Sequence, residues 1–117
     1  MVVSEDAAFI ARVQRLMRKR GSSAVGCLGP ADAAWLPEGV GIAIVDGPAA
    51  GTFAPQWFEK QEVSVRRYAE DLADLHPGVM VVVCGAFEAR ESGAGGGSIA
   101  GLEDRKEALS LLSFLSR

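Results

Sequence analysis

The sequence predicts a small single α/β domain containing a βαβ unit, with about three or four mostly parallel strands flanked by three helices. Two apolar runs, residues 40–46 (VGIAIVD) and 79–87 (VMVVVCGAF), support this prediction because both are short and rich in β-branched residues. The segment between them is long enough for a helix. Strands joined by such a connection run parallel with a right-handed crossover, so the two runs and this helix form the βαβ unit.

Length and composition agree with one globular domain over residues 1–117. The chain has 117 residues, of which 49% are hydrophobic and 23% are charged, and these values are typical of a protein with one packed core. The formal net charge of -3 is too small to indicate a polyanionic or polycationic partner for the chain as a whole.

The first predicted helix covers residues 5–20. Ser4 is the expected N-cap, Glu5 and Asp6 occupy the first turn, and Gly21 supplies the stop. The apolar side chains recur at helical spacing along one side of this segment. They are Phe9, Ile10, Val13, Leu16 and Met17.

A cluster of cationic side chains occupies the second half of this helix: Arg12, Arg15, Arg18, Lys19 and Arg20. Cations near a helix C-terminus are favoured by the helix dipole, so a solvated helix end explains the cluster. The alternative is contact with phosphate or with an acidic partner surface. Because the remainder of the chain is acidic, nucleic-acid binding ranks last among the functions considered.

The next segments contain one short strand and a compact connection. Residues 22–28 predict a short buried strand that ends at Gly29 and Pro30. The following stretch has room for one helical turn before Pro37, and we expect Trp35 to pack over the core.

After the first apolar run, a helical region is expected to open at Thr52 or Ala54 with Pro55 and to end at residues 76–78. A break near residues 61–64 would let Ser64 cap a second helix. Its apolar side chains share one face: Trp57, Phe58, Val65, Tyr68, Leu72 and Leu75.

The C-terminal part begins with a glycine-rich stretch, residues 88–98, for which we expect a mobile loop. A last helix follows, with Glu103 and Asp104 in its first turn. Its apolar face comprises Ala108, Leu109, Leu111, Leu112 and Leu115.

The residues that usually form catalytic and metal sites are scarce. His76 is the single histidine, and the two cysteines, Cys27 and Cys84, lie among apolar residues. Two cysteines and one histidine cannot supply a four-ligand structural zinc site. We therefore expect reduced core thiols, no metal, no cofactor and no catalytic set.

The candidate ligand site lies at the carboxyl ends of the two strands, where ligands gather in open α/β sheets. Its residues are Asp46, Gly47, Gly51 and Cys84. A carboxylate there can hold a metal ion or a hydroxyl group. The alternatives are a plain turn for Asp46 and a core position for Cys84, because His76 lies at the opposite end of the same strand, roughly 25 Å away.

The candidate partner surface consists of large aromatic side chains around the loop after the first apolar run: Trp35, Phe53, Trp57 and Phe58. Core packing under a long connection is the alternative. The leucine stripe of the last helix is expected to bury against the sheet or against a second copy of the chain.

These observations favour a non-catalytic protein-interaction, scaffold or regulatory domain. We expect it to bind a protein partner or to form a homo-oligomer. The alternative is a small-ligand or metal-binding α/β domain, either a binding protein or an enzyme, with its site near Asp46 and Cys84. The N-terminal residues have no apolar run of signal-peptide length, and no stretch approaches the roughly 18 apolar residues of a membrane span. A cytoplasmic location is therefore expected.

Overall fold

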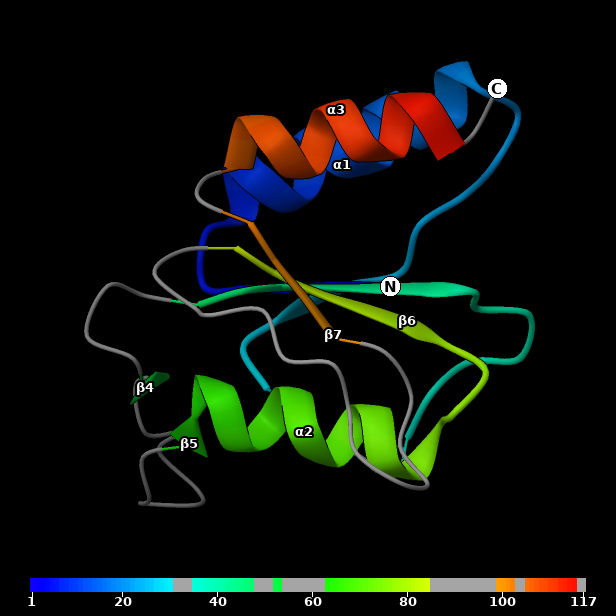
Figure 1. Ribbon diagram of the computed structural model, residues 1–117. Coiled ribbons are helices and arrows are strands. Elements are labelled where there is room, and N and C mark those ends of the chain that lie inside the picture. Colours follow the sequence, from blue (N-terminus) through cyan, green and yellow to red (C-terminus); the bar gives the residue numbers. More distant parts are fainter. Residues whose placement is uncertain (31–34, 48–51, 54–62, 85–98, 103–104, 116–117) are drawn as a thin grey trace.

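A computed structural model describes residues 1–30, 35–47, 52–53, 63–84, 99–102 and 105–115. Five parallel strands form the main sheet: β1 (Val2–Ser4), β2 (Gly26–Leu28), β3 (Ile42–Asp46), β6 (Met80–Cys84) and β7 (Ile99–Leu102). Helices α1 (Ala7–Lys19) and α3 (Arg105–Leu115) cover one face of this sheet, and α2 (Val65–Leu75) covers the other (Figure 1). A short antiparallel pair, β4 (Thr52–Phe53) with β5 (Val63–Ser64), lies beside α2. The predicted α/β class is confirmed.

The order of strands across the sheet is β2-β1-β3-β6-β7. In the order of the five main strands along the chain this is 2-1-3-4-5, the arrangement of flavodoxin-like doubly wound sheets. The chain leaves β1 toward one edge of the sheet and leaves β3 toward the other. The direction of winding therefore reverses between β1 and β3, and this reversal defines the topological switch point.

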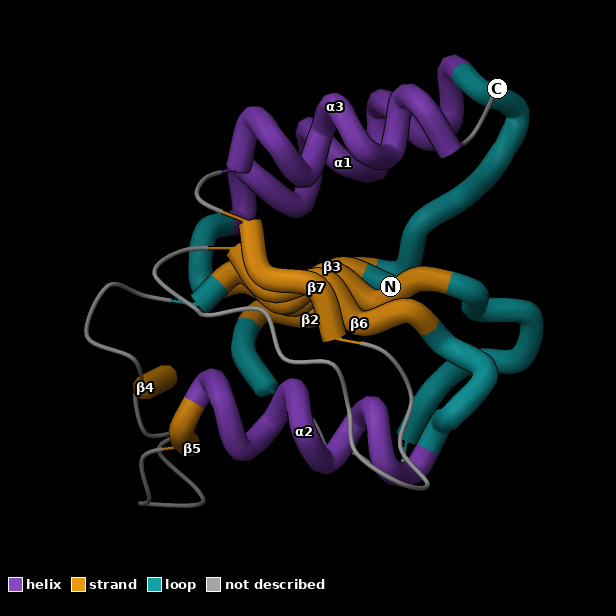
Figure 2. The backbone as a smooth tube through the Cα atoms, viewed as in Figure 1, coloured by secondary structure: helices purple, strands orange, loops and turns teal. Residues whose placement is uncertain are grey.

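The sheet separates two apolar cores, and Figure 2 shows it as the middle of three layers. Alternate residues of β3 and β6 enter different cores: Ala43 and Val45 face α2 with Val81 and Val83, whereas Ile44 faces α1 and α3. Both faces of these central strands are covered, which explains why their sequences are continuously apolar instead of alternating.

The largest departure from the sequence prediction is β1. Val2, Val3 and Ser4 pair with β2 on one side and with β3 on the other. Ser4 is fully buried and does not cap α1 as expected; the cap is Asp6, whose side chain accepts a hydrogen bond from the Ala8 N–H at 2.9 Å. Three residues are too few to show a strand pattern, and β1 forms because neighbours distant in sequence hydrogen-bond to both of its edges.

The remaining elements agree with the sequence prediction in some cases and differ from it in others. Ser64 caps α2 by accepting from the Arg67 N–H at 3.3 Å, as predicted. Residues 26–28 form a strand, but it is the partly exposed edge strand β2 and not a buried one. Thr52 and Phe53 form strand β4, so the helix does not begin at Thr52; the alternative start at Ala54 lies outside the described residues. The predicted glycine-rich loop, the first part of the predicted helix and the acidic pair before α3 lie outside the described residues.

Strand β7 adds a fifth member to the main sheet beside β6, where the sequence predicted three or four strands. The last helix, α3, begins at Arg105. Among the described residues, no helix is long and apolar enough to cross a membrane.

Candidate functional site

The carboxyl ends of β1 and β3 meet at the switch point, and polar side chains gather there. Ser4 ends β1 and Asp46 ends β3, and the two residues are register partners. Asp6 caps α1 directly above them, and Arg105 begins α3. We refer to Ser4, Asp6, Asp46 and Arg105 as the strand-end cluster.

Asp46 is the centre of the strand-end cluster and is 7% exposed. The Ser4 hydroxyl donates a 2.6 Å hydrogen bond to Oδ2 of Asp46. Arg105 donates to both carboxylate oxygens, from Nε to Oδ1 at 3.1 Å and from Nη2 to Oδ2 at 2.8 Å. Such a bidentate pair fixes the planes of both groups relative to each other.

Asp6 closes the cluster from the helix side. Its Oδ2 accepts from Arg105 Nη1 at 2.7 Å, and its backbone N–H donates to the Ser4 hydroxyl at 3.0 Å. The hydrogen bond from Arg105, together with the capping bond from Ala8, lowers the pKa of Asp6. The hydrogen bonds to Asp46, and to a smaller extent the hydrogen bond to Asp6, raise the pKa of Arg105. The guanidinium carbon of Arg105 also lies 4.9 Å from the ring centre of Phe9.

The other residues predicted for this site have different environments. Cys84 is the register partner of Asp46 and is buried at the end of β6. Gly47 directly follows β3, and a Cβ atom built there would lie 2.6 Å from both methyl groups of Val65. Glycine at this position therefore lets the chain leave β3 close to α2. Gly51 lies outside the described residues.

Neither of the two cysteines forms a disulfide. Cys27 is on β2 and Cys84 is on β6, with β1 and β3 between them. Three strand spacings of about 4.8 Å exceed the reach of a disulfide. Burial raises the pKa of the Cys27 thiol, which disfavours the reactive thiolate.

Of the predicted partner surface, the structure describes two residues. Trp35 is about half exposed, whereas Phe53 is fully buried and meets Tyr68 edge to face with ring centres 6.0 Å apart. Phe53 thus packs in the core between the sheet and α2. Trp57 and Phe58 lie outside the described residues.

Sequence reasoning did not find three members of the strand-end cluster: Ser4, Asp6 and Arg105 in their present roles. A polar Ser-Glu-Asp run directly after two valines was the available signal. Its meaning depends on recognising β1 as a strand, because polar residues at strand ends mark the ligand edge of such a sheet. Nothing local distinguishes Arg105 from other helix-start cations.

Chemically, the strand-end cluster is an internally satisfied ion-pair network that joins β1, β3, α1 and α3. In the described ranges, no group of three or more histidine, cysteine, aspartate or glutamate side chains is placed to hold a metal ion. A ligand that uses Asp46 must compete with Arg105 for it.

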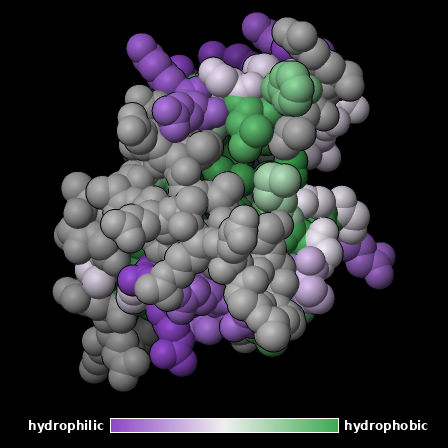
Figure 3. Space-filling model, in the orientation of Figure 1, coloured by the Kyte–Doolittle hydropathy of each residue, from purple (hydrophilic) through white to green (hydrophobic). Residues whose placement is uncertain are grey.

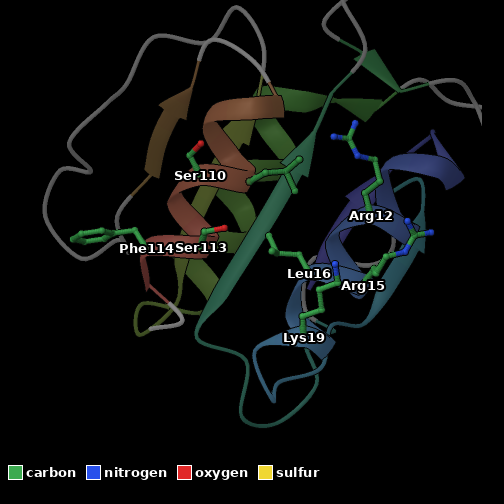
Figure 4. Close-up of a pocket in the computed structure, with 8 residues that line it drawn as sticks. Arg12, Arg15, Leu16, Lys19, Ser110, Ser113 and Phe114 are labelled. Atoms are coloured by element: carbon green, nitrogen blue, oxygen red, sulfur yellow. The ribbon is translucent and has the colours of Figure 1, made fainter.

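A second feature lies between the two helices on the same face of the sheet. A groove of about 540 Å³ runs between α1 and α3, and we call it the α1–α3 groove. Figure 4 shows Leu16 directed toward α3, with Arg15 and Lys19 nearby on α1, whereas the Phe114 ring extends from α3 away from α1 and lies at the outer rim of the groove. Its lining is shared between the helices: Arg12, Arg15, Leu16 and Lys19 from α1, and Leu109, Ser110, Ser113 and Phe114 from α3.

The α3 side of this groove exposes apolar surface. Phe114 is 71% exposed, and Leu109 is partly exposed. Figure 3 shows an apolar patch in the layer formed by α1 and α3, bordered by hydrophilic side chains. An exposed aromatic ring at the rim of a groove is typical of interaction surfaces.

No protein-family model, curated protein or solved structure matches this chain.

Proposed function

We propose that this chain is a non-catalytic protein-interaction domain that binds its partner through the α1–α3 groove. The observation that carries the proposal is the exposed ring of Phe114 at the rim of a groove whose α1 wall is cationic. Folded proteins place most large aromatic side chains inside, and rings that remain outside next to a concave surface anchor partners.

The strand-end cluster supports this proposal by holding the groove in place. Asp6 caps α1, and Arg105 is the first residue of α3, so their 2.7 Å contact joins the N-terminal ends of the two helices that form the groove. Asp46 ties both to the sheet through Arg105. A preformed groove loses less conformational freedom when a partner binds.

The test is selection of binders from a displayed library of amphipathic helical peptides of about 18 residues, a length that can form a helix alone. Peptides selected on the intact chain are expected to lose binding to Phe114→Ala. They should retain binding to Leu75→Ala, because Leu75 is 55% exposed but lies on α2, across the sheet. The proposal would be contradicted if the selected peptides bind Phe114→Ala as tightly as the intact chain, or if no binder is selected.

A small-ligand site at the strand ends is the second candidate. The position of Asp46 at the switch point favours it, with Cys84 as its register partner at the end of β6. The expected ligand is one that replaces Arg105 at Asp46, such as a divalent cation. Thermal unfolding with Mg²⁺ or Ca²⁺ tests it, since a ligand at 100 times its Kd adds about 2.7 kcal/mol. An unchanged Tm with both ions, or a rise that Asp46→Asn retains, would exclude this site.

A further inference from the structure

The cationic wall of the α1–α3 groove lacks neutralising partners within the described residues. Helix α1 contains no aspartate or glutamate. The side chains of Arg12, Arg15 and Lys19 are exposed, and none forms an ion pair with another described residue. These three positions fall on one side of the helix around Leu16.

Helix α2 shows the contrasting arrangement in the same chain. Arg66 pairs with Glu70 at 3.2 Å, and Arg67 pairs with Asp71 at 3.5 Å, each one turn further along the helix. The exposed arginines of α2 are therefore neutralised locally. Those of α1 are not, although the chain as a whole is acidic.

From this difference we infer that the α1–α3 groove binds an acidic amphipathic helix of a partner protein. This inference rests on the proposed function and adds the chemistry of the partner. The apolar face of the incoming helix packs on Leu16 and Leu109 and reaches Phe114 at the outer rim of the groove. Its acidic flank lies along α1 and supplies the carboxylates that α1 lacks.

The spacing of the cations fits such a flank. Arg12 and Lys19 are seven residues apart, which is about 10 Å along a helix. A partner helix that lies beside α1 can place carboxylates opposite these cations. Its carboxylates then occupy positions i, i+3 or i+4, and i+7 of the partner helix, next to apolar residues with the same spacing. This pattern is found in helices that dock into apolar grooves.

A second copy of this chain is a poor occupant of the groove. Symmetric pairing would bring the α1 cations of both copies to one interface, and like charges facing each other disfavour association. The partner is therefore a different polypeptide with negative charge beside its apolar face.

The experiment uses the full chain and three labelled peptides of about 18 residues. The peptides share one leucine-rich face and carry glutamate, glutamine or lysine along its flank. Fluorescence anisotropy is expected to give the tightest binding for the glutamate peptide. This preference should weaken when salt rises from about 0.05 M to about 0.5 M, because exposed charges are screened.

Charge reversal provides the decisive comparison. Arg15→Glu with Lys19→Glu is expected to weaken the glutamate peptide about tenfold and to make the lysine peptide the preferred one. The matched control is Arg66→Glu with Arg67→Glu on α2, which makes the same change in net charge and should leave the order of the peptides unchanged. Circular dichroism of each variant verifies that the helices are retained.

The outcomes separate this inference from the function on which it rests. Equal binding of all three peptides with loss on Phe114→Ala would overturn the acidic partner and keep the interaction surface. If the peptides bind Phe114→Ala as tightly as the original chain, both the acidic partner and the interaction surface are overturned. Duplex DNA that displaces the glutamate peptide and binds Phe114→Ala unchanged would replace the protein partner with a nucleic acid.

Discussion

Replacing Arg105 with methionine removes the guanidinium that joins α3 to the sheet and to α1, together with its cation–π contact with the Phe9 ring, while keeping an unbranched apolar side chain. The substitution leaves the carboxylate of Asp46, whose side chain is 8% exposed, with the Ser4 hydroxyl as its remaining partner within the strand-end cluster. A charge left buried without its counter-ion is costly, so we expect a clear loss of stability.

The magnitude follows from the contacts. Arg105 donates two hydrogen bonds to Asp46, and a hydrogen bond to a charged group contributes about 1.5–3 kcal/mol. Breaking a fully buried pair costs about 3–5 kcal/mol, but the Arg105 side chain is 45% exposed, so solvent screens part of the interaction. The expected loss in the free energy of unfolding is therefore about 2–3 kcal/mol.

Urea denaturation at neutral pH measures this loss. With an m value of about 1–3 kcal/mol/M, the midpoint should fall by about 0.7–3 M without a change in m. Arg67→Met is the matched control, because its pair with Asp71 is 3.5 Å long and the Arg67 side chain is 78% exposed. We expect it to change stability by less than about 0.5 kcal/mol.

A double-mutant cycle with Asp46→Asn assigns the loss to the pair itself. Coupling of about 1 kcal/mol or more between the two substitutions is expected for residues in direct contact. If Arg105→Met unfolds at the same urea concentration as the original chain, or if the two substitutions are additive, the strand-end cluster does not hold α3 and this reasoning is refuted.

Three further predictions test single contacts. The pKa of Asp6 is lowered in the folded chain, so its carboxylate stabilises the fold above the unfolded pKa of about 3.9, and this contribution is lost as pH falls through the folded pKa. The difference in Tm between the original chain and Asp6→Asn should therefore shrink from pH 6 to pH 3, and a constant difference would refute this. Gly47→Ala should destabilise by about 1–3 kcal/mol by overpacking against Val65, and Val65→Ala should restore part of the loss in chemical denaturation; an unchanged midpoint for Gly47→Ala would contradict the close approach. Ser64→Ala should cost about 0.5–2 kcal/mol by removing the cap of α2, whereas Ser64→Asp should stay near the original stability; equal losses would argue against capping.

The elements that the sequence predicted well are those with a strong local pattern. The helical period of α1, the Ser64 cap of α2 and the apolar runs of β3 and β6 each depend on residues close together in the chain. The parallel pairing of β3 with β6 followed from the helix-length connection between them. Asp46 was placed at the ligand edge of the sheet for the same reason.

The remaining features depend on contacts between distant parts of the chain. Ser4 bonds to a residue 42 positions away, and Asp6 bonds to Arg105 across 99 positions. A three-residue segment such as β1 shows no period by itself and becomes a central strand because β2 and β3 offer it hydrogen bonds on both edges.

The amino-acid sequence by itself therefore determined the α/β class, the βαβ unit and the strand end on which Asp46 lies. Strand order, the burial of Phe53, the strand-end cluster and the α1–α3 groove were decided by tertiary structure. The physical reason is that periodicity and capping act over one or two turns of chain, whereas strand order decides which distant side chains meet. The cations of α1 illustrate both levels, since the sequence displays them and only the fold places them across the groove from Leu109.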